Sequence, residues 1–125
     1  MVLPFAYAQA LFADEQYSKA VSVLIPAFEE LTPEKEGVFF PRGLYSEDDI
    51  LFEQIDRLVE KAELYSFDSD LQLLLGYQLL GIGEYDEAAA PLQRARQADR
   101  TEASAEVLLD LLEKIKTDST ENTDQ

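Results

Sequence analysis

The stretch LGYQLLGIGEYDEAAAPLQRA, residues 75–95, repeats the pattern of an earlier stretch, YAQALFADEQYSKAVSVLIPA, residues 7–27. Similar residues recur at an offset of 68 positions, which pairs Tyr17 with Tyr85 and Ala20 with Ala88. This offset is twice the length of about 34 residues that is typical of a helical repeat. Because one such unit cannot bury its own apolar face, repeats stack on each other. The spacing therefore predicts an all-α protein built from stacked helical hairpins.

The positions that recur most clearly carry small or aliphatic side chains. Small residues let two helices approach closely, and leucines fill the space between them. We expect these positions to form the contacts within and between hairpins: Ala8, Leu11, Ala20, Leu24 and Ala27 in the first, and Gly76, Leu79, Ala88, Leu92 and Ala95 in the second.

With this arrangement, both hairpins resemble the tetratricopeptide repeat, and the chain is similar to small, degenerate repeat units of bacterial proteins. The resemblance covers about residues 1–100 and implies a short α-solenoid of two and a half repeats, closed by a C-terminal capping helix. The chain departs from the family pattern because it contains no Trp and because a connector replaces the first helix of the middle repeat.

Apolar periodicity and turn residues place the individual helices. We expect one helical domain over residues 1–117 and a disordered, acidic and polar tail over residues 118–125. Asp68 or Ser69 should cap the fourth helix, and Thr101 should cap the last. The expected helices cover residues 4–13, 17–30, 47–65, 70–80, 85–98 and 102–116.

Between the second and third of these helices lies a connector, residues 34–46, that does not read as a helix. Gly37, Pro41 and Gly43 interrupt it, although many of its other residues are strongly apolar. We expect an extended segment that can cover an apolar surface of the same chain. The residues available for such a contact are Val38, Phe39, Phe40, Leu44 and Tyr45.

Composition excludes several function classes. The chain has 125 residues, enough for one domain, and it contains neither Cys nor His, which removes disulfides, thiolate metal sites and imidazole chemistry. The sequence also shows no paired acid–base or nucleophile constellation, so we expect no enzyme activity and no cofactor. The net charge of −16 repels phosphates, so nucleic acid is an unexpected partner.

The apolar start of the chain does not have the pattern of a signal peptide. Lys19 is the first basic residue, and Pro4 interrupts the apolar run. No apolar stretch approaches the length of about 20 residues that spans a bilayer, so we expect no membrane insertion and a soluble chain. The compartment stays open: the cytoplasm is the default, and a place within a larger or envelope-associated protein is the alternative.

The family resemblance also implies a binding site. Tetratricopeptide repeats bind extended peptides on the concave face formed by the first helix of each repeat. In this chain, that face corresponds to Phe5, Gln9, Phe12, Leu73, Tyr77 and Leu80. The alternative is that these six residues are core, covered by the connector, because apolar stripes at helical spacing are usually buried. Some family members clamp a terminal carboxylate with Lys and Asn here, but this chain has neither residue type at these places.

Other polar clusters favour structural roles. The pair Asp68 and Asp70 begins like a calcium loop, but the required Gly and Glu are missing, so helix capping is the better interpretation and we expect no metal site. Arg94, Arg96 and Arg100 form the main basic cluster, which either pairs with nearby acids or contacts an acidic partner.

These observations favour a protein-interaction scaffold or adaptor that binds a peptide or protein segment in a helical groove. Two alternatives remain open. The first is a self-associating structural module that forms homo-oligomers through the apolar connector, and the second is a small acidic chaperone for a secreted client.

Overall fold

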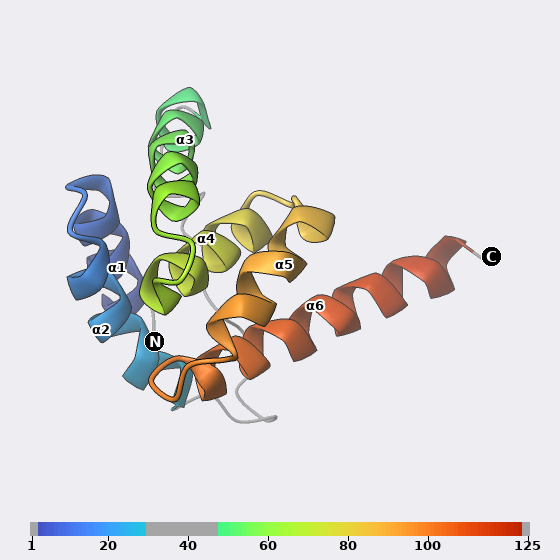
Figure 1. The fold of residues 1–125 in the computed structure, drawn as a ribbon. Coiled ribbons are helices and arrows are strands. Elements are labelled where there is room, and N and C mark those ends of the chain that lie inside the picture. Colours follow the sequence, from blue (N-terminus) through green and yellow to red (C-terminus); the bar gives the residue numbers. More distant parts are fainter. Residues whose placement is uncertain (1–2, 30–47, 124–125) are drawn as a thin grey trace.

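The computed structural model describes residues 3–29 and 48–123, and within these two ranges the chain forms six helices and no strand (Figure 1). The expectation of an all-helical fold is confirmed. The connector residues Val38, Phe39, Phe40, Leu44 and Tyr45 lie outside the described ranges. The helices are α1 (Leu3–Ala13), α2 (Tyr17–Glu29), α3 (Asp48–Leu64), α4 (Ser69–Gly81), α5 (Tyr85–Ala95) and α6 (Glu102–Thr123).

Helix α4 lies at the centre of the molecule. It pairs with α5 as a hairpin and also packs against α2, α3 and α6, while α1 pairs with α2 (Figure 1). Every residue from Leu71 to Leu80 is buried. A helix that is apolar all round belongs in a core, and the run LQLLLGYQLL has this composition. The other helices therefore assemble around α4.

The two hairpins share one turn geometry. In the first, the Gln16 amide donates to the Leu11 carbonyl (2.8 Å) and the Glu15 amide to that of Phe12 (2.9 Å). In the second, the same pair of bonds recurs 68 positions later: Glu84 to Leu79 (2.9 Å) and Gly83 to Leu80 (3.2 Å). Both pairs form the Schellman motif, which needs a left-handed residue after the helix. Glu15 (φ 59°) and Gly83 (φ 84°) occupy that position.

The ten recurring small and aliphatic residues are all buried, from Ala8 in α1 to Ala95 in α5. They join residues of α3 and α6 in one hydrophobic core. In α3 the buried stripe is Leu51, Ile55, Leu58 and Ala62, and in α6 it is Ala105, Leu108 and Leu112.

Helix ends agree with the sequence in some places and differ in others. Asp68 caps α4 as expected, because its carboxylate accepts a hydrogen bond from the Leu71 amide (3.2 Å). Helix α5 ends at Ala95 and not at Ala98, and the Thr101 hydroxyl donates to the Ala95 carbonyl (2.5 Å). This bond satisfies a terminal carbonyl of α5.

Helix α6 continues to Thr123, so residues 118–123 are helical where the sequence predicts a disordered tail. The reason is that no Gly or Pro follows Lys116 to stop the helix. The C-terminal half of α6 projects beyond the other helices (Figure 1).

One polar network joins α2, α4 and the connection between α5 and α6. Asp70 accepts hydrogen bonds from the Arg100 side chain (3.1 Å) and from the Ser18 hydroxyl (3.3 Å). A second nitrogen of Arg100 donates to the Ser22 hydroxyl (2.8 Å). Arg100 therefore pairs with a nearby acidic residue, Asp70. This is one of the two roles that the sequence leaves open for the basic cluster.

Candidate functional site

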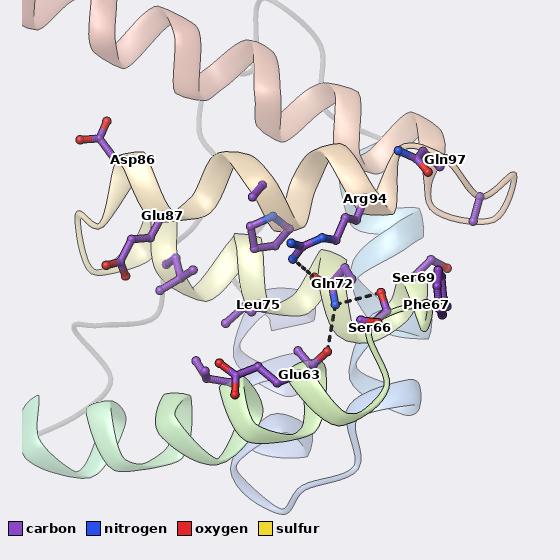
Figure 2. A pocket seen from close by; sticks show the side chains of 16 residues that line it. Glu63, Ser66, Phe67, Ser69, Gln72, Leu75, Asp86, Glu87, Arg94 and Gln97 are labelled. Carbon is purple, nitrogen blue, oxygen red and sulfur yellow. Dashed lines mark hydrogen bonds between the residues drawn. The ribbon is translucent and has the colours of Figure 1, made fainter.

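A cleft with a volume of about 770 Å³ lies between α3 and α5, over α4 (Figure 2). We call it the α3–α5 cleft. Its apolar lining consists of Val59, Ala62, Phe67, Leu75, Leu79, Ala90, Pro91 and Ala98. Its polar lining consists of Glu63, Ser66, Ser69, Gln72, Asp86, Glu87, Arg94 and Gln97.

Packing around α4 explains the cleft. Helices α3 and α5 both contact α4 and form the two walls, while α4 contributes the floor through Leu75 and Leu79. The side chains of Ala62 on one wall and Ala90 on the other are too short to fill the space between the walls. The site is concave and combines apolar with polar side chains, as binding surfaces do.

A buried amide organises the polar side of the cleft. Gln72 is only 1% exposed, and its side-chain nitrogen donates to the carbonyls of Ala62 and Ser66, at 3.3 Å each. Its oxygen accepts a hydrogen bond from Nη1 of Arg94 at 3.4 Å. The two backbone carbonyls fix the orientation of the amide, because only its nitrogen can donate to them. The amide oxygen therefore holds the exposed Arg94 side chain beside the cleft (Figure 2).

Acidic side chains stand on both walls of the cleft. Glu63 comes from α3, and Asp86 and Glu87 come from the first turn of α5. Asp86 forms an ion pair with Lys116 of α6 (3.1 Å). No ion pair involves Glu63 or Glu87 among the described residues. The α3–α5 cleft thus carries two uncompensated carboxylates on opposite walls.

Large apolar side chains are exposed where α3 ends and the turn to α4 begins, and one of them borders the cleft. Phe67, in the turn between α3 and α4, is fully exposed, and Leu64 and Tyr65 beside it are 76% and 58% exposed. Water contact with such side chains is unfavourable by about 25 cal/mol per Å² of apolar surface. Three neighbouring residues of this kind distinguish the turn from scattered single apolar residues, and Phe67 itself lines the cleft.

The residues that the sequence places in a peptide groove are buried instead. Phe5, Gln9, Phe12, Leu73, Tyr77 and Leu80 are each at most 3% exposed. The structure does not present them as an open surface, and all six belong to the core. The reason is that α1 and α2 pack directly against this side of α4. The connector that the alternative places over them lies outside the described residues.

Direct contacts show how these residues pack. The ring centroids of Phe5 and Phe28 both lie near Tyr77, at 6.3 and 5.7 Å. Beside these rings, the amides of Gln9 and Gln78 exchange two hydrogen bonds, at 3.2 and 2.7 Å. Burial raises the pKa of the Tyr77 hydroxyl far above its ordinary value. The α1–α4 interface is therefore an aromatic cluster with one satisfied polar pair.

The sequence did not identify the α3–α5 cleft. The available signal was the segment LYSF, residues 64–67, which places three large apolar side chains at the end of α3 and in the turn that follows. Turns at a surface are usually polar, so this segment marks an exposed apolar patch. No repeat position coincides with it, and the resemblance pointed to the other side of α4.

Residues 3–29 and 48–123 contain no cluster of three or more possible metal ligands. Asp68 caps α4 and Asp70 binds Arg100, in place of the calcium-loop start that their spacing resembles. None of the helices in these ranges combines the length and the apolar character that crossing a bilayer requires.

Comparisons with protein-family models, with curated proteins and with solved structures found no match to this chain. The functional conclusion therefore depends on the geometry and chemistry of the α3–α5 cleft.

Proposed function

We propose that the protein is a protein-interaction module that holds a segment of a partner in the α3–α5 cleft. The observation that carries this proposal is the combination of an apolar cleft with a fully exposed Phe67 at its border. Aromatic side chains are among the residues that most often supply the binding energy of protein interfaces. No catalytic step is part of the proposal.

We also infer that the chain is built from stacked tetratricopeptide-like repeats. Two hairpins with the same turn hydrogen bonds at an offset of 68 residues support this inference. The proposed binding surface differs from the one that the resemblance implies, because the first helices of the two hairpins are covered. The cleft instead opens between α3 and α5, the helices that correspond to second helices of repeats.

A peptide display library of random 12-residue sequences, selected on the immobilised 125-residue protein, tests the proposal. The selected peptides are synthesised and their affinities measured by fluorescence anisotropy. Two variants alter the cleft without changing the net charge or the core. Phe67→Ser removes the exposed ring, and Ala90→Gln narrows the space from the α5 wall. Both positions are exposed, so the melting temperature should stay within about 2 °C of the parent.

Two matched variants control for general surface effects. Tyr7→Ser removes an exposed aromatic side chain from α1, and Ala103→Gln lengthens an exposed alanine of α6; neither residue lines the cleft. We expect at least a tenfold loss of peptide affinity in the cleft variants and less than a twofold change in the controls. Equal affinity in all five proteins would reject the α3–α5 cleft as the binding surface.

A further inference from the structure

The charges along the α3–α5 cleft have an order. Glu87 and Arg94 are seven residues apart on α5, which is two helical turns and about 10 Å, so their side chains leave the same face. Glu63 stands on the opposite wall from Glu87, and Leu75 lies on the floor between them (Figure 2). Both carboxylates are therefore near one end of the cleft, and Arg94 is further along α5, beside Gln72.

The two ends of the cleft differ in the sign of the charged side chains that have no ionic partner among the described residues. Glu63 and Glu87 form no ion pair within the described residues, whereas their neighbour Asp86 is paired with Lys116. At the other end, Arg94 donates a hydrogen bond to a neutral acceptor, the amide oxygen of Gln72, at 3.4 Å. A guanidinium forms stronger hydrogen bonds to a carboxylate than to a neutral amide. One end of the cleft suits a cation, and the other suits an anion.

On the basis of the proposed function, we propose that the occupant is a segment of a partner protein with a defined charge order. An apolar side chain contacts Leu75, a Lys or Arg side chain lies between Glu63 and Glu87, and a carboxylate lies against Arg94. Because the charges that it meets are about 10 Å apart, the two charged residues of the segment are three positions apart if it is extended and seven if it is helical.

Charge complementarity favours such a partner over a second copy of this chain. Two copies, each with a net charge of −16, repel one another before their apolar surfaces meet. The proposed segment carries one charge of each sign, so it does not meet this repulsion. The carboxylates at the cleft then fix which end of the segment lies where, a role that charges perform more effectively than they supply affinity.

Two observations test this proposal: the sequences of the library peptides whose binding depends on the cleft, and the affinity of these peptides for charge variants of the protein. We expect them to contain a basic and an acidic residue three or seven positions apart, on either side of an apolar residue. The double variant Glu63→Gln/Glu87→Gln should bind them at least tenfold more weakly. Its matched control is Glu102→Gln/Glu106→Gln on α6, which changes the net charge equally at exposed positions outside the cleft and should alter affinity less than twofold.

Charge reversal separates local pairing from general attraction. The triple variant Glu63→Lys/Glu87→Lys/Arg94→Glu should lose the selected peptides and bind peptides in which the basic and acidic residues are exchanged. The inference is overturned if the cleft-dependent peptides lack this charge order, or if the triple variant does not prefer the exchanged peptides. Either result leaves the proposed function standing. If no peptide depends on the cleft, both fall.

Sedimentation velocity tests whether a second copy of this chain occupies the cleft. The parent should sediment as a monomer at 10 to 100 μM and at physiological ionic strength. A concentration-dependent dimer that Phe67→Ser abolishes and Tyr7→Ser does not would identify the occupant as a second copy and overturn the inference.

Discussion

Gly76 of α4 lies directly against Leu92 of α5: a Cβ atom built on Gly76 would be 2.5 Å from Cγ of Leu92. Real Cβ atoms essentially never come so close to another carbon, so the two helices can pack at this distance only because residue 76 has no side chain. The small residue that recurs in the two hairpins is therefore required by a specific contact in the second one.

Gly76→Ala should lower the free energy of unfolding by about 1–3 kcal/mol, because the new methyl group overpacks the contact with Leu92. Urea unfolding measures the change. In the Leu92→Ala background the space is vacant, and there Gly76→Ala should be neutral or stabilising, since Ala is a better helix former than Gly by about 1 kcal/mol. An equal loss in both backgrounds would contradict the proposed contact.

The buried pair Gln9 and Gln78 gives a second prediction. Gln78→Leu removes one partner and leaves the Gln9 amide without these two bonds in an apolar interface, which should cost about 1–3 kcal/mol. The double variant Gln9→Leu/Gln78→Leu should be more stable than the sum of the single changes implies. A double-mutant cycle measured by urea unfolding tests this coupling, and strictly additive losses would show that the two amides act independently.

The two hairpin turns predict opposite effects of matched substitutions. Glu15 has φ 59°, a region that costs most L-residues about 1–2 kcal/mol, so Glu15→Gly should raise the stability by about 0.5–1 kcal/mol. Gly83 has φ 84°, and a Cβ added there would meet no atom within 4 Å, so Gly83→Ala should lower the stability by about 1 kcal/mol through backbone strain alone. Thermal unfolding of both variants provides the test, and a shift of the same sign in both would contradict it.

Stability should fall at alkaline pH through Tyr77. Burial raises the pKa of its hydroxyl far above the ordinary value near 10, so the folded protein keeps this proton while the unfolded chain loses it. The contribution is fully present below pH 10 and decreases as pH rises further, with a limiting slope of about 1 kcal/mol per pH unit. Burial, and then the carboxylate of Glu15, also raise the pKa of Tyr17, while Arg57 lowers it.

Urea unfolding between pH 8 and pH 11 measures this dependence. Tyr77→Phe should show a shallower decline above pH 10 than the parent. Tyr65→Phe, which changes an exposed tyrosine in the turn after α3, is the matched control and should follow the parent. If Tyr77→Phe declines as steeply as the parent, the titration of Tyr77 is not the cause.

Local sequence patterns predicted the helices well because their physical basis is local. The 3.6-residue periodicity, the Asp68 cap and the recurring small residues all act within one or two turns of helix. The predicted end of α6 was wrong for a related reason: polar composition alone does not stop a helix that meets no Gly or Pro.

The candidate site could not be predicted in the same way. The α3–α5 cleft depends on how α3 and α5 are placed against α4, which is a property of tertiary packing. The burial of Leu73, Tyr77 and Leu80 did have a sequence signal, because residues 71–80 contain no charged side chain on any face. The resemblance to repeats with an open concave surface outweighed that signal.

The projecting half of α6 has a practical consequence for measurement. At 1.5 Å per residue, the 22 residues of this helix span about 33 Å. A fluorophore attached near its C-terminal end would be kept at a distance from Phe67 by a helical spacer. Energy transfer between that dye and one on a peptide would then report the direction in which the peptide lies in the cleft, without any change to the residues that contact it.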